Sequence, residues 1–164
     1  MQIIPVLVKE LEQEAQTTRK FLSIIPNDKF SWKPHEKSMT IQQLATHIAE
    51  LPSWVVLAYN TEEIDFAAND YKPTLLNSST ELLKLLEKNL VDAKVSLEKF
   101  NDDLLAKNWT MRNGDQIYFT MTKAELIRTT YSQIIHHRAQ LGVFLRLLNI
   151  PLPGSYGPSA DVPF

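Results

Sequence analysis

Apolar residues recur at steps of three and four along four long stretches of the chain, which is the spacing of an amphipathic helix. The clearest pattern covers residues 122–150, where one stripe contains Ile127, Ile134 and Leu141. The other stretches with this period are residues 4–25, 40–59 and 78–100. Because each stripe must be buried against another element, the pattern predicts an all-α fold in which four helices form a bundle.

Start and break signals mark the ends of these helices. Thr40, Ser78 and Thr122 each stand three residues before a Gln or Glu, which is the spacing of a capping box. Pro52 lies inside the second helical pattern, where it removes a backbone donor and crowds the preceding turn. We therefore expect a kink or a break in the second helix at this proline.

Besides residues 29–38, which are interpreted as a packed loop, three stretches lack a helical period. Residues 104–122 contain an Asn113-Gly114 pair flanked by strand-forming residues, which predicts a small β-hairpin between the third and fourth helices. Residues 60–78 are interpreted as a long surface connection. Residues 151–164 contain too many prolines and glycines for a helix, so they are either disordered or extended over the bundle.

Composition narrows the class of protein. A chain of 164 residues with 44% hydrophobic and 22% charged residues is typical of one soluble domain, here residues 1–164. The net charge of -2 and the interleaved lysines and acids argue against nucleic acid as a partner. Without cysteine there is no disulfide, thiolate metal site or cysteine nucleophile. The sequence shows neither a basic leader nor a membrane-spanning apolar run, so we expect a cytoplasmic protein with no membrane partner.

Two of the four histidines lie on the apolar sides of predicted helices. His137 falls on the stripe of the fourth helix, and His47 stands beside the stripe of the second. Gln133 precedes His137 by four residues, so these two side chains can converge on one point. Imidazole is a common ligand of zinc, nickel and iron, and a catalytic site needs about three protein ligands. All three residues are therefore candidate metal ligands, although an amide oxygen is a neutral and weak donor. In the alternative interpretation the histidines are hydrogen-bonded core residues.

The remaining candidates are weaker. His136 is rotated by about 100° from His137 and should face a neighbouring helix or solvent. His35 lies in a loop and is expected to be exposed. The sequence contains no inward Glu-x-x-His pairs of the di-iron bundles, no glycine-rich phosphate loop and no nucleophile elbow.

Several segments carry a resemblance to a known family. In chain order they are SWKPHEKSMT, LATHIAELPSW and HHRAQLGVFLRLLNIPLPGSYGPSAD. This arrangement resembles the DinB-like superfamily over nearly the whole chain. The resemblance implies an up-down-down-up four-helix bundle, often a homodimer, that holds a divalent metal. The implied ligands are one histidine of the second helix, matched by His47, and a His-x-x-x-His pair of the fourth, matched by Gln133 and His137.

The resemblance also implies two kinds of activity. Related proteins include thiol transferases and metal-dependent hydrolases, in which a metal lowers the pKa of a bound thiol or water. Our first hypothesis is therefore a protein with a weakened or altered site for zinc, nickel or iron that acts on an unknown small molecule. His136 or Glu50 would handle protons, and no catalytic residue is assigned. The alternative is a non-catalytic bundle that binds a ligand or partner and keeps a vestigial metal site.

Overall fold

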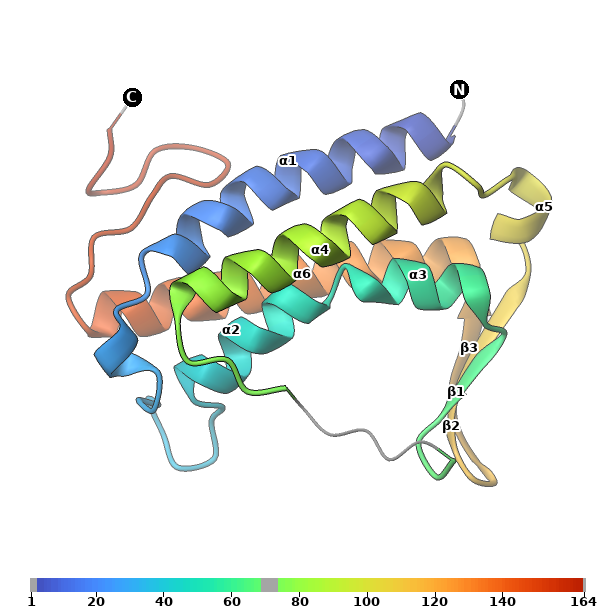
Figure 1. Cartoon of the computed structure of the whole chain (residues 1–164), viewed down its shortest axis with the longest axis horizontal. Helices are drawn as coiled ribbons and strands as arrows, with labels where there is room; N and C mark the ends of the chain where they lie inside the picture. Colours follow the sequence, from blue (N-terminus) through green and yellow to red (C-terminus); the bar gives the residue numbers. More distant parts are fainter. Residues whose placement is uncertain (1–2, 69–73, 164) are drawn as a thin grey trace.

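Four long helical segments pack lengthwise in the computed structural model, which describes residues 3–68 and 74–163 (Figure 1). The predicted four-helix bundle is therefore confirmed. Its second segment consists of two helices, as expected from the proline in its pattern. The segments are α1 (Ile3–Ser23), α2 (Ile41–Glu50) followed by α3 (Ser53–Asn60), α4 (Ser79–Leu97) and α6 (Lys123–Leu147).

The helix ends follow the sequence signals. Thr40 and Gln43 form a capping box at α2, in which the Gln43 amide donates to the Thr40 hydroxyl at 3.2 Å and the Thr40 amide donates to Gln43 Oε1 at 2.9 Å. Thr122 and Glu125 form the same box at α6. At Pro52 the chain breaks rather than kinks, because α2 ends at Glu50 and α3 begins at Ser53.

The predicted hairpin is present between α4 and α6, with two corrections. Strands β2 (Asn108–Asn113) and β3 (Gln116–Thr122) pair antiparallel, and Asn113 lies opposite Gln116. The turn is therefore Gly114-Asp115, one residue later than predicted, and Gly114 supplies the positive φ of 58°. A third strand, β1 (Glu63–Asp65), pairs parallel with β2 inside the stretch that we had interpreted as connection. Three residues are too few to show a strand period.

A continuous core joins the helices to the sheet. Trp109 of β2 is fully buried, and its Nε1 donates to the Thr61 hydroxyl at 3.0 Å. The Trp109 ring also meets the ring of Trp54 on α3 at 6.3 Å between centroids. Two short helices were not predicted, namely η1 (Asn27–Lys29) and α5 (Asp102–Leu105). Trp109 thereby fixes the sheet at the end of α3.

The C-terminal segment lies against the bundle. Residues 151–163 form no helix or strand, yet the Tyr156 hydroxyl donates to the Glu14 carboxylate of α1 at 2.8 Å. Arg146 of α6 forms an ion pair with Asp161. Of the two alternatives left open by the sequence, the extended arrangement over the bundle is the one observed.

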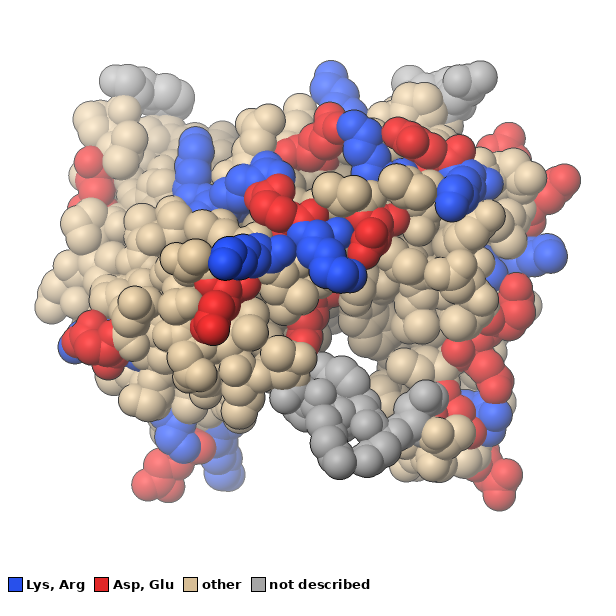
Figure 2. Space-filling view, viewed as in Figure 1, with Lys and Arg blue, Asp and Glu red and all other residues tan. Residues whose placement is uncertain are grey.

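The surface over α1 and α4 mixes charges of both signs (Figure 2). Ion pairs between Arg19 and Glu87 and between Lys94 and Glu12 link these two helices. Within residues 3–68 and 74–163, no helix is long and apolar enough to cross a membrane.

Candidate functional site

His47 of α2 and His137 of α6 meet side by side between the helices. Their ring centroids are 4.9 Å apart, and the rings make an angle of 73°. Both side chains are half-buried. This was expected for His47, which stands beside its apolar stripe, whereas His137 was predicted to point inward from its stripe. Two residues that are remote in the sequence thus form one imidazole pair.

Gln140 orients the second histidine of this pair. His137 Nδ1 lies 3.0 Å from Oε1 of Gln140, one turn further along α6. A carbonyl oxygen only accepts hydrogen bonds, so Nδ1 carries the proton in this contact. In the neutral ring the lone pair therefore resides on Nε2, which is the nitrogen available to a metal or a proton.

The environment favours the neutral form of His47. Burial lowers the pKa of His47 below its ordinary value, and the neighbouring His137 lowers it further because two positive charges would repel each other. A neutral imidazole offers a lone pair, which is the form that binds a metal ion.

Gln133 lies outside this pair. Its side chain is exposed on α6 one turn before His137. It lines a shallow hollow together with His136, which is also exposed. The His136 ring nevertheless approaches the His137 ring at 4.9 Å between centroids. The structure therefore brings together His47 and His137, and leaves Gln133 at the edge.

His35 takes no part in this site. It is exposed in the loop before α2, where its Nδ1 accepts a hydrogen bond from the Lys37 amide at 3.1 Å. The prediction that it is exposed is confirmed.

The donor set fits a metal only in part. In the described portion of the chain, no group of three or more His, Asp or Glu residues is arranged to hold a metal ion. Two imidazoles are one ligand short of the three that catalytic zinc sites use. His47 and His137 can supply two nitrogen ligands, whereas the third position depends on the neutral amide of Gln133.

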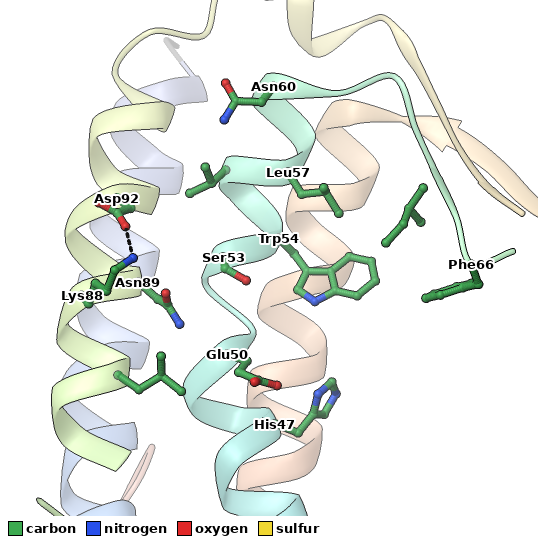
Figure 3. Close-up of a pocket in the computed structure, with 13 residues that line it drawn as sticks. His47, Glu50, Ser53, Trp54, Leu57, Asn60, Phe66, Lys88, Asn89 and Asp92 are labelled. Carbon is green, nitrogen blue, oxygen red and sulfur yellow. Dashed lines mark hydrogen bonds and ion pairs between the residues drawn. The ribbon is translucent and has the colours of Figure 1, made fainter. Parts of the chain in front are cut away.

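A pocket of about 700 Å³ opens beside His47 (Figure 3). Glu50 of α2 and Trp54 of α3 line it, as does Asn89 of α4, which is buried and donates from Nδ2 to the Ala49 carbonyl at 2.9 Å. The sequence alone did not identify Trp54 or Asn89 as site residues. A signal existed for Trp54, which follows His47 by seven residues and so lies on the same side of a continuous helical pattern.

The fold and the site together define a class of protein, namely a four-helix bundle with an imidazole pair between its second and last long helical segments. A model of the DinB family matches residues 1–162. The chain therefore belongs to the DinB family.

Solved structures show the same fold. A DinB-like protein of Bacillus subtilis, YjoA, is 19% identical, and the alignment covers 96% of both chains with a TM-score of 0.68. YfiT of Bacillus subtilis is 15% identical over 90% of this chain and 89% of its own, with a TM-score of 0.64, and is described as a probable metal-dependent hydrolase. A mycothiol-dependent maleylpyruvate isomerase is 17% identical over 85% of this chain and 60% of its own, with a TM-score of 0.61. No curated protein matches the sequence.

Proposed function

We propose that this DinB-family protein binds a divalent metal through His47 and His137 and acts on a small molecule, as a thiol transferase or a hydrolase. The observation that carries the proposal is the pair of imidazole rings 4.9 Å apart, contributed by α2 and α6. Zinc, nickel or iron suits such nitrogen donors. Gln133 is the proposed third ligand, and its weak amide makes the site weaker than one with three histidines.

The residues around the proposed metal site would have different roles. The Gln140 carbonyl holds His137 in the form whose Nε2 is unprotonated. Burial lowers the pKa of His47 and so favours its neutral form. Glu50 lines the pocket with His47 and is the better candidate to exchange protons with a substrate, because His136 lies on the exposed surface of α6. A bound metal would supply Lewis acidity that lowers the pKa of a thiol or water.

Two similar structures support this class of activity. One is described as a probable metal-dependent hydrolase and another as a mycothiol-dependent isomerase. Since both are less than 20% identical to this chain, their likeness supports the fold, and the activity is carried over as part of the proposal.

A second candidate function is a non-catalytic bundle that binds a ligand or partner. The donor set favours it, because no group of three or more His, Asp or Glu residues in the described part of the chain is arranged to hold a metal ion. In this case the two histidines would be polar residues of the bundle interior.

Metal analysis of protein purified without a histidine tag separates the two candidates. We expect up to one equivalent of zinc, nickel or iron after dialysis, and we expect His137→Ala to lose it. His35→Ala is the matched control, because His35 is an exposed histidine outside the pair and its loss should leave the metal content unchanged. Folded protein that takes up no metal on dialysis against any of the three ions would contradict the metal site.

Two further properties belong to this proposal. An up-down-down-up order of the helices is supported by the ribbon, in which α1 and α6 run one way and α3 and α4 the other (Figure 1). A homodimer is supported by exposed apolar side chains on the outer helices, namely Val6 of α1 and Val143 and Leu147 of α6. Sedimentation at micromolar concentration tests the dimer, and a monomer there would overturn it.

A further inference from the structure

The pocket beside His47 has the size of a small-molecule site. Its volume of about 700 Å³ lies within the range of roughly 300 to 1,000 Å³ that ligand pockets occupy. It is bordered by α2 and α3, by α4, and by the segment that contains β1. A ligand in this pocket would lie in contact with one member of the imidazole pair.

Beside His47 and the Glu50 carboxylate, part of the pocket wall is apolar and aromatic (Figure 3). The side chains of His47, Trp54 and Phe66 lie on the same side of the α2–α3 segment (Figure 3). Leu57 and Ile64 line the same pocket. Such a wall offers flat faces to a planar apolar group, for which aromatic side chains are well suited.

Other side chains already hold the two aromatic residues of this wall. The Trp54 ring packs edge to face against the buried Trp109 at 6.3 Å, and the Phe66 ring lies 6.5 Å from the Tyr118 ring of β3. Rings that already contact other rings before binding lose less side-chain entropy when a ligand arrives than isolated side chains do.

The charged residues of the pocket do not favour an anionic ligand. Among the described residues that line it, the charged ones are Glu50, Lys88 and Asp92. Lys88 is the only cation of the three, and it donates to Asp92 at 2.9 Å on the α4 side (Figure 3). A buried carboxylate is usually paired with arginine or lysine, and the described lining next to Trp54 offers neither.

From these observations we propose that the pocket binds a neutral compound with a flat aromatic body, which lies against Trp54 and Phe66 and points its polar end toward His47. The claim that this compound is the substrate rests on the proposed function, whereas its binding to the pocket requires no metal. The proposal predicts that the pocket does not favour a small dicarboxylate, because such a dianion has no apolar body and needs cationic partners.

Calorimetric titration of protein treated with EDTA tests the preference with three probes. Naphthalenemethanol is neutral, naphthalenecarboxylate has the same ring system with a negative charge, and maleate is a small dianion. We expect naphthalenemethanol to bind about tenfold tighter than naphthalenecarboxylate, which corresponds to about 1.4 kcal/mol, and maleate to show no binding. Equal or tighter binding of either anion, or no binding of the neutral probe, overturns the proposal.

Two matched variants locate the probe. Phe66→Ala removes an exposed ring from the pocket, and we expect a loss of affinity of roughly tenfold from the lost apolar contact. Leu147→Ala removes an apolar side chain that is even more exposed than Phe66 from another hollow, at the end of α6, and should leave affinity unchanged. The reverse pattern would place the probe in that other hollow and would refute the assignment. Trp54→Ala should weaken binding further. Because the Trp54 ring also contacts the buried Trp109, circular dichroism checks that this variant remains folded.

Repeating the titrations with zinc separates this inference from the proposed function. If metal binds to the His47–His137 pair but the neutral probe does not bind, only the pocket assignment is wrong. If the neutral probe binds with the expected preference and no metal binds, the metal-dependent function is wrong and the ligand pocket stands.

Discussion

The guanidinium of Arg138 and the carboxylate of Glu14 form a buried ion pair between α6 and α1, with Nη2 and Oε2 2.6 Å apart. Arg138 is 2% exposed and Glu14 is 6% exposed. Because Arg138 directly follows His137, this pair fixes the rotation of α6 at the position of the site. When Arg138 faces α1, the preceding residue is directed toward α2, where His47 lies.

Breaking this ion pair is expected to destabilise the protein strongly. Arg138→Ala leaves the Glu14 carboxylate buried without its cation, for which the loss of stability is about 3 to 5 kcal/mol. Arg138 also donates to the Glu14 carbonyl and to the Thr18 hydroxyl, both at 3.1 Å, so these acceptors lose a partner as well. Urea unfolding of the variant measures the loss.

A double replacement tests whether the cost comes from the unpaired charge. Glu14→Met combined with Arg138→Met removes both charges and keeps apolar volume, so we expect it to recover most of the stability lost in Arg138→Ala. Tyr156→Phe, which removes one hydroxyl from the same cluster, should cost only about 1 kcal/mol. A double variant as unstable as the single one would show that packing, not charge, dominates here.

Local signals were sufficient for much of the fold. The four helices, the capping boxes at Thr40 and Thr122 and the interruption at Pro52 depend on residues within one or two turns, so the sequence determines them. Strand β1 depends on pairing with β2, in which Glu63 lies opposite Thr110. The local sequence pattern carries no signal of such a distant contact. The strand was therefore interpreted as part of a surface connection.

The candidate site was predictable to a similar extent. His47 and His137 were identified because helical periodicity shows on which side of its helix each residue lies. The exposure of Gln133 was not predicted, although four residues correspond to about 400° and so leave it rotated by about 40° from His137. His137 is only half-buried, so this rotation is enough to expose Gln133. The Glu14–Arg138 pair left a signal too, since Glu14 interrupts the stripe of Leu7, Leu11 and Thr18.

Gln140 is expected to control the tautomer of His137. With the Gln140 carbonyl in place, the proton should reside on Nδ1, which is the less common neutral tautomer of free histidine. Gln140→Leu removes the acceptor and should shift the proton largely to Nε2, while the helix remains intact because Gln140 is exposed. Nitrogen-15 NMR of the histidine ring in metal-free protein reports the tautomer directly. An unchanged spectrum in the variant would contradict the orienting role.

The capping box at α6 predicts a pH dependence of stability. The amide of Thr122 donates a hydrogen bond to the Glu125 carboxylate and makes the larger contribution to holding the pKa of that carboxyl below its usual range. The Thr122 hydroxyl also donates to this carboxylate and lowers the pKa further. A carboxyl with a lowered pKa in the folded state stabilises the protein above the unfolded pKa of about 4.3. That contribution is lost as the pH falls through the lower, folded value.

Glu125→Gln is the matched variant for this dependence, because an amide oxygen keeps both hydrogen bonds but does not titrate. The wild type should be the more stable of the two near neutral pH, and the difference should shrink as the pH falls below about 4.3. Urea unfolding of both proteins across this range measures it. A difference that does not change with pH would mean that the charge of Glu125 contributes nothing to the cap.

Gln133→His tests whether the site is one ligand short of a strong metal centre. The substitution places a third imidazole one turn before His137, and rotation about its side-chain bonds can carry it from the exposed edge toward His47. We expect zinc affinity to rise by at least about tenfold, or about 1.4 kcal/mol, in titrations of metal-free protein. Ser132→His is the control, because residue 132 is also exposed but is rotated by about 100° more from His137 than residue 133 is. An equal gain in both variants would indicate adventitious binding by a surface histidine. No gain in Gln133→His would show that these side chains do not converge on one ion.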